Sequence, residues 1–155
     1  MFAGLGRGLV DFTLEQLMNP KTWLILAGLL GAVGVALGAF GAHWLPGWLE
    51  GLSLDPAEVG KRMHNWEVGV RYQMYHALAL AVVALLAFQR SGTALTVAGV
   101  CFLLGVLIFS GLLYALVLSG VKILGAIVPI GGVLMIIGWL ALLVAAAGMP
   151  GRSLS

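Results

Sequence analysis

Residues 94–118, ALTVAGVCFLLGVLIFSGLLYALVL, form an apolar run that contains no charged side chain. A helix of about 20 apolar residues is long enough to cross the ~30 Å hydrocarbon core of a bilayer. Inside that core the backbone must satisfy its own hydrogen bonds, which leaves only helices or closed barrels. Because the run is continuously apolar and does not alternate in polarity, it predicts a membrane-spanning helix.

Three similar runs extend this reading to most of the chain. They occupy residues 24–42, 70–88 and 123–147, and only the run at 70–88 is polar at its start. Hydrophobic residues make up 61 % of the sequence, above the roughly 45–50 % of soluble globular proteins. The links between the later runs are short, which makes neighbouring helices antiparallel. The sequence therefore predicts an all-α, polytopic membrane protein, an antiparallel bundle of four transmembrane helices at about residues 22–42, 66–88, 94–118 and 123–147.

Short segments flank the predicted transmembrane domain, which covers residues 20–149. In residues 1–19 the apolar side chains fall on one helical face, with Asp11 and Glu15 opposite, which predicts an N-terminal amphipathic, interfacial segment. A disordered leader is the alternative. The lack of a long apolar run there argues against a cleavable signal peptide. Residues 150–155 are a short tail.

The charges of the chain bear on its partners and its orientation. The formal net charge is +2 and Lys and Arg form no cluster, so we expect no binding to nucleic acid. Positive charges near the span ends normally fix the topology, but here they divide evenly between the two sides of the predicted bundle. The expected partners are membrane lipids, with a second copy or another membrane protein as the alternative.

The first span carries a seam of small residues on one helical face. Gly31, Gly34, Gly38 and Gly41 recur at spacings of three and four. Small residues let helices in a membrane approach closely and gain dispersion contacts that lipid does not replace. We therefore expect the first helix to pack centrally against a neighbour, and a cofactor cleft is the less favoured alternative.

The start of the second helix is open to two interpretations. Asp55 and Pro56 form a favourable N-cap and first helical position. The helix therefore either begins near Pro56, outside the membrane, and continues past Trp66, or it breaks near Asn65.

The fourth span contains a potential helix break at Pro129, followed by Gly131 and Gly132. Proline inside a helix removes one hydrogen bond and clashes with the carbonyl four residues earlier. This helix is therefore either kinked at Pro129 or begins there.

Nearly all polar residues at membrane depth lie in residues 66–76, WEVGVRYQMYH. Polar groups in the hydrocarbon core are costly and are functional candidates by default. Glu67 and Arg71 are four residues apart, which predicts a structural ion pair on one helix face.

His76 lies deeper than these charges, and two interpretations of it stay open. It is either a neutral histidine bonded inside the bundle, to Ser110 or Tyr114, or a proton or ligand site, since histidine titrates near neutral pH. Trp139 lies in the middle of the fourth run, and its indole N–H is expected to find an acceptor on another helix.

The polar residues of the spans predict one intramembrane cluster that binds a ligand. Its members are His43, Tyr72, Gln73, His76, Ser110 and Tyr114. Phosphate loops, Ser-His-Asp triads, paired catalytic carboxylates and H-x-x-x-H or C-x-x-C spacings do not occur in the sequence. We therefore predict no catalytic residue, no metal site and no cofactor.

Four blocks of the sequence resemble the signature blocks of a known family. They are LGAFGAH at 37–43, YQMYHALAL at 72–80, FSG at 109–111 with LY at 113–114, and PIGG at 129–132 with GW at 138–139. They are similar to the YgdD-like family of small inner-membrane proteins (domain of unknown function 423, transmembrane protein 256 family). The resemblance covers about residues 23–147. It implies a four-helix, multi-pass protein of the bacterial inner membrane and implies no biochemical activity.

The resemblance also places the six candidate residues at signature positions of the family. Two positions depart from its pattern, because Leu112 stands where the family usually has serine and Val128 where it usually has threonine. Both departures remove a hydroxyl, so we expect a thinner polar network than the family pattern implies.

Three functions stay open on these grounds. The favoured one is a non-enzymatic membrane protein whose His/Tyr/Gln cluster binds a small ligand or lipid or docks a membrane partner. A small oligomeric transporter or proton-conducting protein is suggested by His76 and the break at Pro129. A haem- or metal-binding redox protein would use the three histidines.

Overall fold

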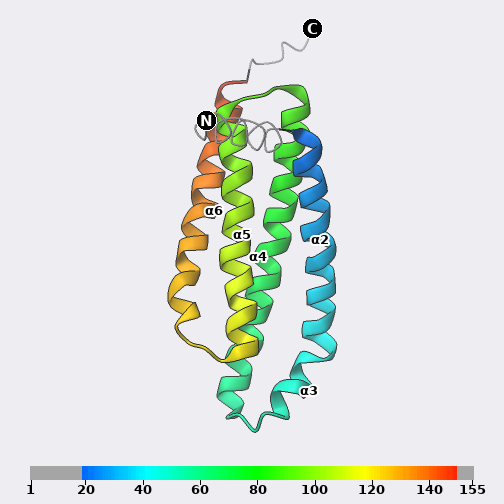
Figure 1. Ribbon diagram of the computed structural model, residues 1–155, viewed down its shortest axis with the longest axis vertical. Coiled ribbons are helices and arrows are strands. Elements are labelled where there is room, and N and C mark those ends of the chain that lie inside the picture. The colour runs from blue at the N-terminus through cyan, green and yellow to red at the C-terminus, as the bar shows by residue number, and fades with distance from the viewer. Residues whose placement is uncertain (1–18, 150–155) are drawn as a thin grey trace, which may run out of the picture.

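The computed structural model describes residues 19–149 of the chain. This part forms the helices α2 (Pro20–His43), α3 (Leu45–Glu50), α4 (Pro56–Gln89), α5 (Thr93–Ser119) and α6 (Leu124–Ala147). All except α3 are long and apolar enough to span a membrane, and they run alongside one another (Figure 1). The prediction of an all-α membrane protein with four spanning helices is confirmed. The predicted interfacial segment (apart from Asn19) and the tail from residue 150 lie outside the described residues.

Helix α4 extends well beyond the apolar part of its sequence. The Asp55 side chain accepts a hydrogen bond from the Ala57 N–H at 2.8 Å, and Pro56 takes a first-turn position that needs no N–H. The helix then continues through Asn65 to Gln89, so the alternative with a break near Asn65 is wrong. Because residues 56–65 are polar and precede the apolar run, we place them outside the hydrocarbon core.

Helix α6 passes through Pro129 instead of beginning there, since its first residue is Leu124. The alternative with a start at Pro129 is wrong. Gly131, half a turn further on, allows α5 to approach closely: a Cβ there would lie 2.5 Å from the Phe109 backbone nitrogen and 2.8 Å from the Gly105 carbonyl oxygen. The absence of a side chain therefore lets the two backbones touch.

The helices pack in the order α2, α4, α5, α6, each against the next. Helix α2 therefore lies at one edge, and the expectation that it would be central is wrong. Three of its glycines do face α4. They are Gly34, Gly38 and Gly41, which lie nearest to Met74, Val70 and Trp66. Gly31 has no atom of another residue near its missing side chain and takes no part in this contact.

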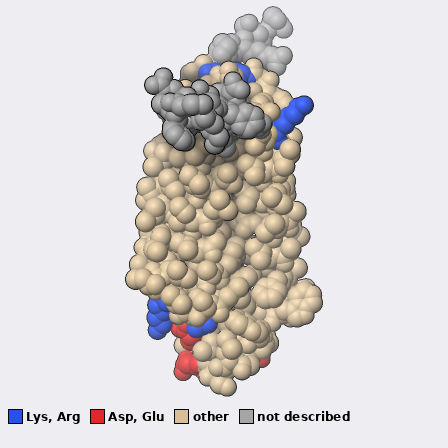
Figure 2. Space-filling model, in the orientation of Figure 1, with Lys and Arg blue, Asp and Glu red and all other residues tan. Residues whose placement is uncertain are grey.

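The outside of the bundle is apolar along most of its length. On the face shown in Figure 2, Lys, Arg, Asp and Glu lie towards the two ends, and the middle carries none. Large apolar side chains such as Ile25, Leu78 and Ile136 are 70 %, 64 % and 61 % exposed. Such a surface is unfavourable in water and suited to contact with acyl chains.

Candidate functional site

Gln73 is the centre of a polar network that joins α2, α4 and α5. Its amide nitrogen donates to the Leu30 carbonyl at 2.8 Å, and its amide oxygen accepts from the Tyr114 hydroxyl at 3.0 Å. Nearby, the Ser110 hydroxyl donates to the Gly69 carbonyl at 2.8 Å. These side chains are bonded to the protein itself, so they hold helices together and are not open to a ligand.

His76 belongs to a separate site between α4 and α6. Its Nδ1 lies 2.8 Å from the Tyr72 backbone oxygen. Because a carbonyl only accepts, Nδ1 carries the proton. Nε2 is then free to accept, and it receives the indole N–H of Trp139 at 3.2 Å. The expected partners Ser110 and Tyr114 are therefore incorrect, and both ring nitrogens of a neutral His76 are engaged.

An apolar hollow of about 360 Å³ lies beside this pair, lined by α4, α5 and α6. The Tyr72 ring forms one wall, 4.8 Å from the Phe109 ring between centroids, and Trp139 and Val133 form another. Tyr72 is 39 % exposed. Of the side chains described around this hollow, Tyr72 alone has a polar atom that is not bonded within the protein.

A second hollow, of about 270 Å³, lies between the same three helices at the end of the bundle opposite to the start of α2. Arg62 is buried there, donating from Nε to Glu58 at 3.0 Å and from Nη1 to the Val117 carbonyl at 3.0 Å. Lys61 and Lys122 also line it and are exposed. The hydrogen bond from Arg62 lowers the pKa of Glu58, and the charges of Lys122 and Lys61 lower it further.

These two hollows lie at successive depths on the same side of the bundle, between α4 and α6 and against α5, and they share no lining residue. On α6 the first reaches Pro129 and the second reaches Val128. On α5 they reach Phe109 and Leu113, one turn apart. We call the two hollows together the α4–α6 groove; the inner hollow is apolar, and the hollow at the surface end carries positive charge.

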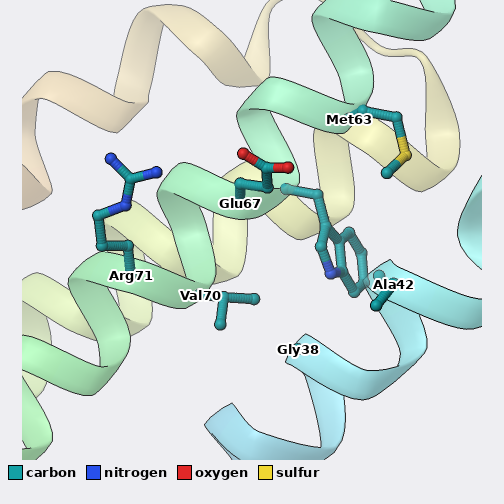
Figure 3. Close-up of a pocket in the computed structure, with 8 residues that line it drawn as sticks. Gly38, Ala42, Met63, Glu67, Val70 and Arg71 are labelled. Carbon is teal, nitrogen blue, oxygen red and sulfur yellow. The ribbon is translucent and has the colours of Figure 1, made fainter.

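A further hollow, of about 320 Å³, lies between α2 and α4. Gly38 and Ala42 of α2 and Val70, Glu67 and Arg71 of α4 line it (Figure 3). The predicted ion pair between Glu67 and Arg71 is not formed, and within residues 19–149 the structure has a single ion pair, Arg62–Glu58. Both pairs have the same sequence spacing, so spacing alone did not distinguish them.

His43 lies apart from the other candidate residues. It is exposed at the end of α2 and lines a shallow hollow with Trp44 and Trp48. The six predicted residues therefore occupy three places: the Gln73 network, the His76 site and the end of α2. Across residues 19–149, no three His, Cys, Asp or Glu side chains gather as metal ligands would.

Sequence reasoning did not single out the surface end of the α4–α6 groove. The signals were present: Glu58 and Arg62 are one turn apart, and Lys122 lies in the short link between α5 and α6. Their meeting depends on how α4 packs against α5, which spacing along one helix does not reveal.

Comparison with known proteins identifies the family to which this chain is similar. A family model described as "Protein of unknown function (DUF423)" matches residues 37–132. The chain is 44 % identical over 127 residues to the UPF0382 membrane protein YwdK of Bacillus subtilis, covering 81 % of this chain and 96 % of that one. It is also 44 % identical over 131 residues to the UPF0382 membrane protein SERP0230 of Staphylococcus epidermidis, covering 84 % and 99 %. No solved structure matches the chain.

Proposed function

The chain belongs to the DUF423 family of membrane proteins, and we propose that it is a non-catalytic, multi-pass protein of the bacterial cell membrane that binds a phosphate-bearing lipid. The observation that carries this proposal is the α4–α6 groove, in which an apolar hollow is followed by one with free lysines. A phospholipid or a polyprenyl phosphate has the same two parts in the same order.

The apolar end of the groove suits a hydrocarbon chain. Phe109, Val133 and Trp139 offer apolar surface, and Gly132 leaves room between them because it has no side chain. The Tyr72 hydroxyl offers one hydrogen bond, for an ester or hydroxyl group of the ligand. Pockets of this kind, mostly apolar with few polar groups, are typical of small-molecule sites.

The surface end suits an anionic headgroup. Arg62, Lys61 and Lys122 bring three positive charges to it and Glu58 one negative charge. Arg62 is held by Glu58 and Val117, which leaves the two lysines for the ligand. Basic pockets between transmembrane helices bind anionic headgroups in this way, at about 1 kcal/mol for each cation near the membrane surface.

The contacts of the histidines give less support to a proton-conducting or histidine-ligated role. A proton relay needs a ring nitrogen that can gain and release its proton, whereas both nitrogens of His76 are bonded. His43 is at the end of α2, too far along the bundle to share a ligand with it.

The test begins with the protein in nanodiscs that contain equal amounts of phosphatidylglycerol and phosphatidylcholine. Native mass spectrometry then measures how much of each lipid the protein retains when it is released from the nanodiscs. The double variant Lys61→Gln/Lys122→Gln should lower the affinity for phosphatidylglycerol about 30-fold, which corresponds to about 1 kcal/mol for each lysine. Lys21→Gln removes an exposed lysine at the other end of the molecule and should change nothing. Gly132→Phe should fill the apolar hollow and also weaken retention.

Three results would overturn the proposal. Equal retention of the two lipids by the wild-type protein is the first. The second has two parts: millimolar glycerol phosphate displaces the lipid, and the Gly132→Phe variant retains as much lipid as the wild-type protein. Together these results would assign the basic hollow to a soluble phosphate. The third is a lipid-free dimer that Gly132→Phe dissociates, which would assign the groove to a second copy.

A further inference from the structure

We propose that the hollow between α2 and α4 binds the headgroup of an ethanolamine phospholipid, with Arg71 on the phosphate and Glu67 on the ammonium group (Figure 3). This site lies on α4 away from the α4–α6 groove, and it shares no lining residue with the two hollows of that groove. The inference therefore stands or falls independently of the proposed function.

The first observation is that two opposite charges of α4 are left unpaired by the protein. Glu67 and Arg71 are one helical turn apart, a spacing at which such side chains normally pair. Both are exposed, and within residues 19–149 neither takes part in an ion pair. Both residues line the hollow, and in Figure 3 their charged ends lie apart and point away from Gly38 and Ala42 of α2, so each is available to a separate group of a ligand.

The second observation is that the hollow has a preformed wall. The Trp66 indole N–H donates to the Leu37 carbonyl at 2.9 Å, and its ring packs so closely on Gly41 that a Cβ there would lie 2.5 Å from it. Gly38 and Ala42 add little side-chain volume. The space of about 320 Å³ is therefore made by small residues on α2 and kept open by a fixed indole on α4.

The third observation is the depth order of the two charges. Val70 lies opposite Gly38 and Trp66 opposite Gly41, and α2 ends at His43. Glu67 is therefore nearer the membrane surface, and the backbone of Arg71 is about 6 Å deeper. An ethanolamine phospholipid presents its ammonium group outermost, its phosphate next and its acyl chains innermost. The outer carboxylate thus meets the ammonium and the inner guanidinium meets the phosphate.

The chemistry of the pair also selects among lipids. A guanidinium binds a phosphate in a bidentate, charge-assisted way. A carboxylate accepts N–H hydrogen bonds from a primary ammonium, whereas the quaternary ammonium of choline has no N–H to give. A lipid with a net negative charge gains nothing from Glu67. Phosphatidylethanolamine is therefore preferred over phosphatidylcholine and phosphatidylglycerol at this site.

The decisive experiment uses the wild-type protein in nanodiscs of neutral lipid. It is titrated with phosphatidylethanolamine, its N-methyl and N,N-dimethyl derivatives and phosphatidylcholine, all with the same acyl chains, and occupancy is read by native mass spectrometry. Affinity should fall as N–H groups are lost, by about tenfold over the series. Equal affinity across the series would overturn the proposal without any variant.

Variants then locate the site. Glu67→Gln should abolish the preference for ethanolamine, and Arg71→Gln should weaken the binding of every lipid in the series because all of them carry the phosphate. Glu50→Gln and Lys21→Gln, which remove exposed charges elsewhere, should preserve both the affinity and the preference. The charge-exchanged double variant Glu67→Arg/Arg71→Glu keeps the net charge but reverses the depth order, and it should not regain the preference. Full preference in the exchanged variant would show a non-specific charge effect and reject the assignment.

Discussion

The indole N–H of Trp139 donates to Nε2 of His76 at 3.2 Å and joins α6 to α4 through a partly buried contact. The other ring nitrogen of His76 is bonded to the Tyr72 carbonyl, so the imidazole acts as a fixed connector between two helices that otherwise meet through α5. His76 is 4 % exposed, so its ring lies away from acyl chains, whereas Trp139 is 48 % exposed at the surface of the bundle.

We predict that the two residues are energetically coupled. Trp139→Phe leaves the Nε2 lone pair of His76 without a donor, and hydrogen bonds between transmembrane helices are worth about 1 kcal/mol. A double-mutant cycle with His76→Phe, measured by reversible unfolding in mixed micelles, should give a coupling energy of about that size. Strictly additive losses would show that the contact contributes nothing.

Gly131 and Gly132 should differ sharply in their tolerance of a methyl group. A Cβ at Gly131 meets the backbone of Phe109 at 2.5 Å, whereas at Gly132 the nearest atoms are 3.9 Å away. Gly131→Ala should therefore lower the free energy of unfolding by about 1–3 kcal/mol through forced separation of α5 and α6, with Gly132→Ala as its matched control. Equal stability of the two variants would contradict this account of the helix contact.

The glycines of α2 offer a parallel comparison. Gly41→Ala places a methyl group 2.5 Å from the Trp66 ring, while Gly31→Ala meets open space. We expect Gly41→Ala to shift Trp66 and lower the melting temperature, and Gly31→Ala to leave it unchanged or raise it, since alanine favours a helix by about 1 kcal/mol over glycine. Circular dichroism melts of both variants decide the matter.

Arg62 should be far less replaceable than its neighbour Lys61. Arg62→Gln removes a charge that is bonded to Glu58 and leaves the Val117 carbonyl without its donor, which costs about 1–3 kcal/mol for a buried group. Lys61→Gln changes an exposed side chain and should cost less than about 0.5 kcal/mol. A similar loss in both would show that the Arg62 contacts are not stabilising.

Glu58 should make stability depend on pH on the acid side. Its pKa lies below the usual 4.5 because of the hydrogen bond from Arg62 and the nearby lysines. A folded-state pKa lower than the unfolded one gives stability that is present above the unfolded value and is lost as the pH falls through the folded value. Unfolding should therefore become easier as the pH drops below about 4.5, and Glu58→Gln should reduce this dependence. Glu50→Gln, on α3, is the control, and an unchanged acid profile in Glu58→Gln would contradict the prediction.

The sequence predicts the spanning helices well because length and polarity alone decide which segments enter a bilayer. The start of α4 was foreseeable in the same local way, from Asp55 and Pro56. Partners of polar side chains were not, since periodicity gives the face and depth of a residue but not the helix opposite. His76 was therefore assigned to Ser110 or Tyr114, and it instead reaches Trp139.

The position of α2 shows the same limit. Its glycine spacing indicates that one face packs closely, which is observed for Gly34, Gly38 and Gly41, but not how many neighbours surround the helix. Likewise, Glu58–Arg62 and Glu67–Arg71 have equal spacing, and the Val117 carbonyl of α5 fixes the position of only Arg62.

The polar first turns of α4 limit how deeply this end of the protein can enter the membrane. If the bilayer thickens, Arg62 with Lys61 and Lys122 resists being drawn into hydrocarbon. At the opposite end of the bundle, Lys21 and Arg90 resist in the same way. The vertical position of the protein in its membrane is thus held by charges at both ends.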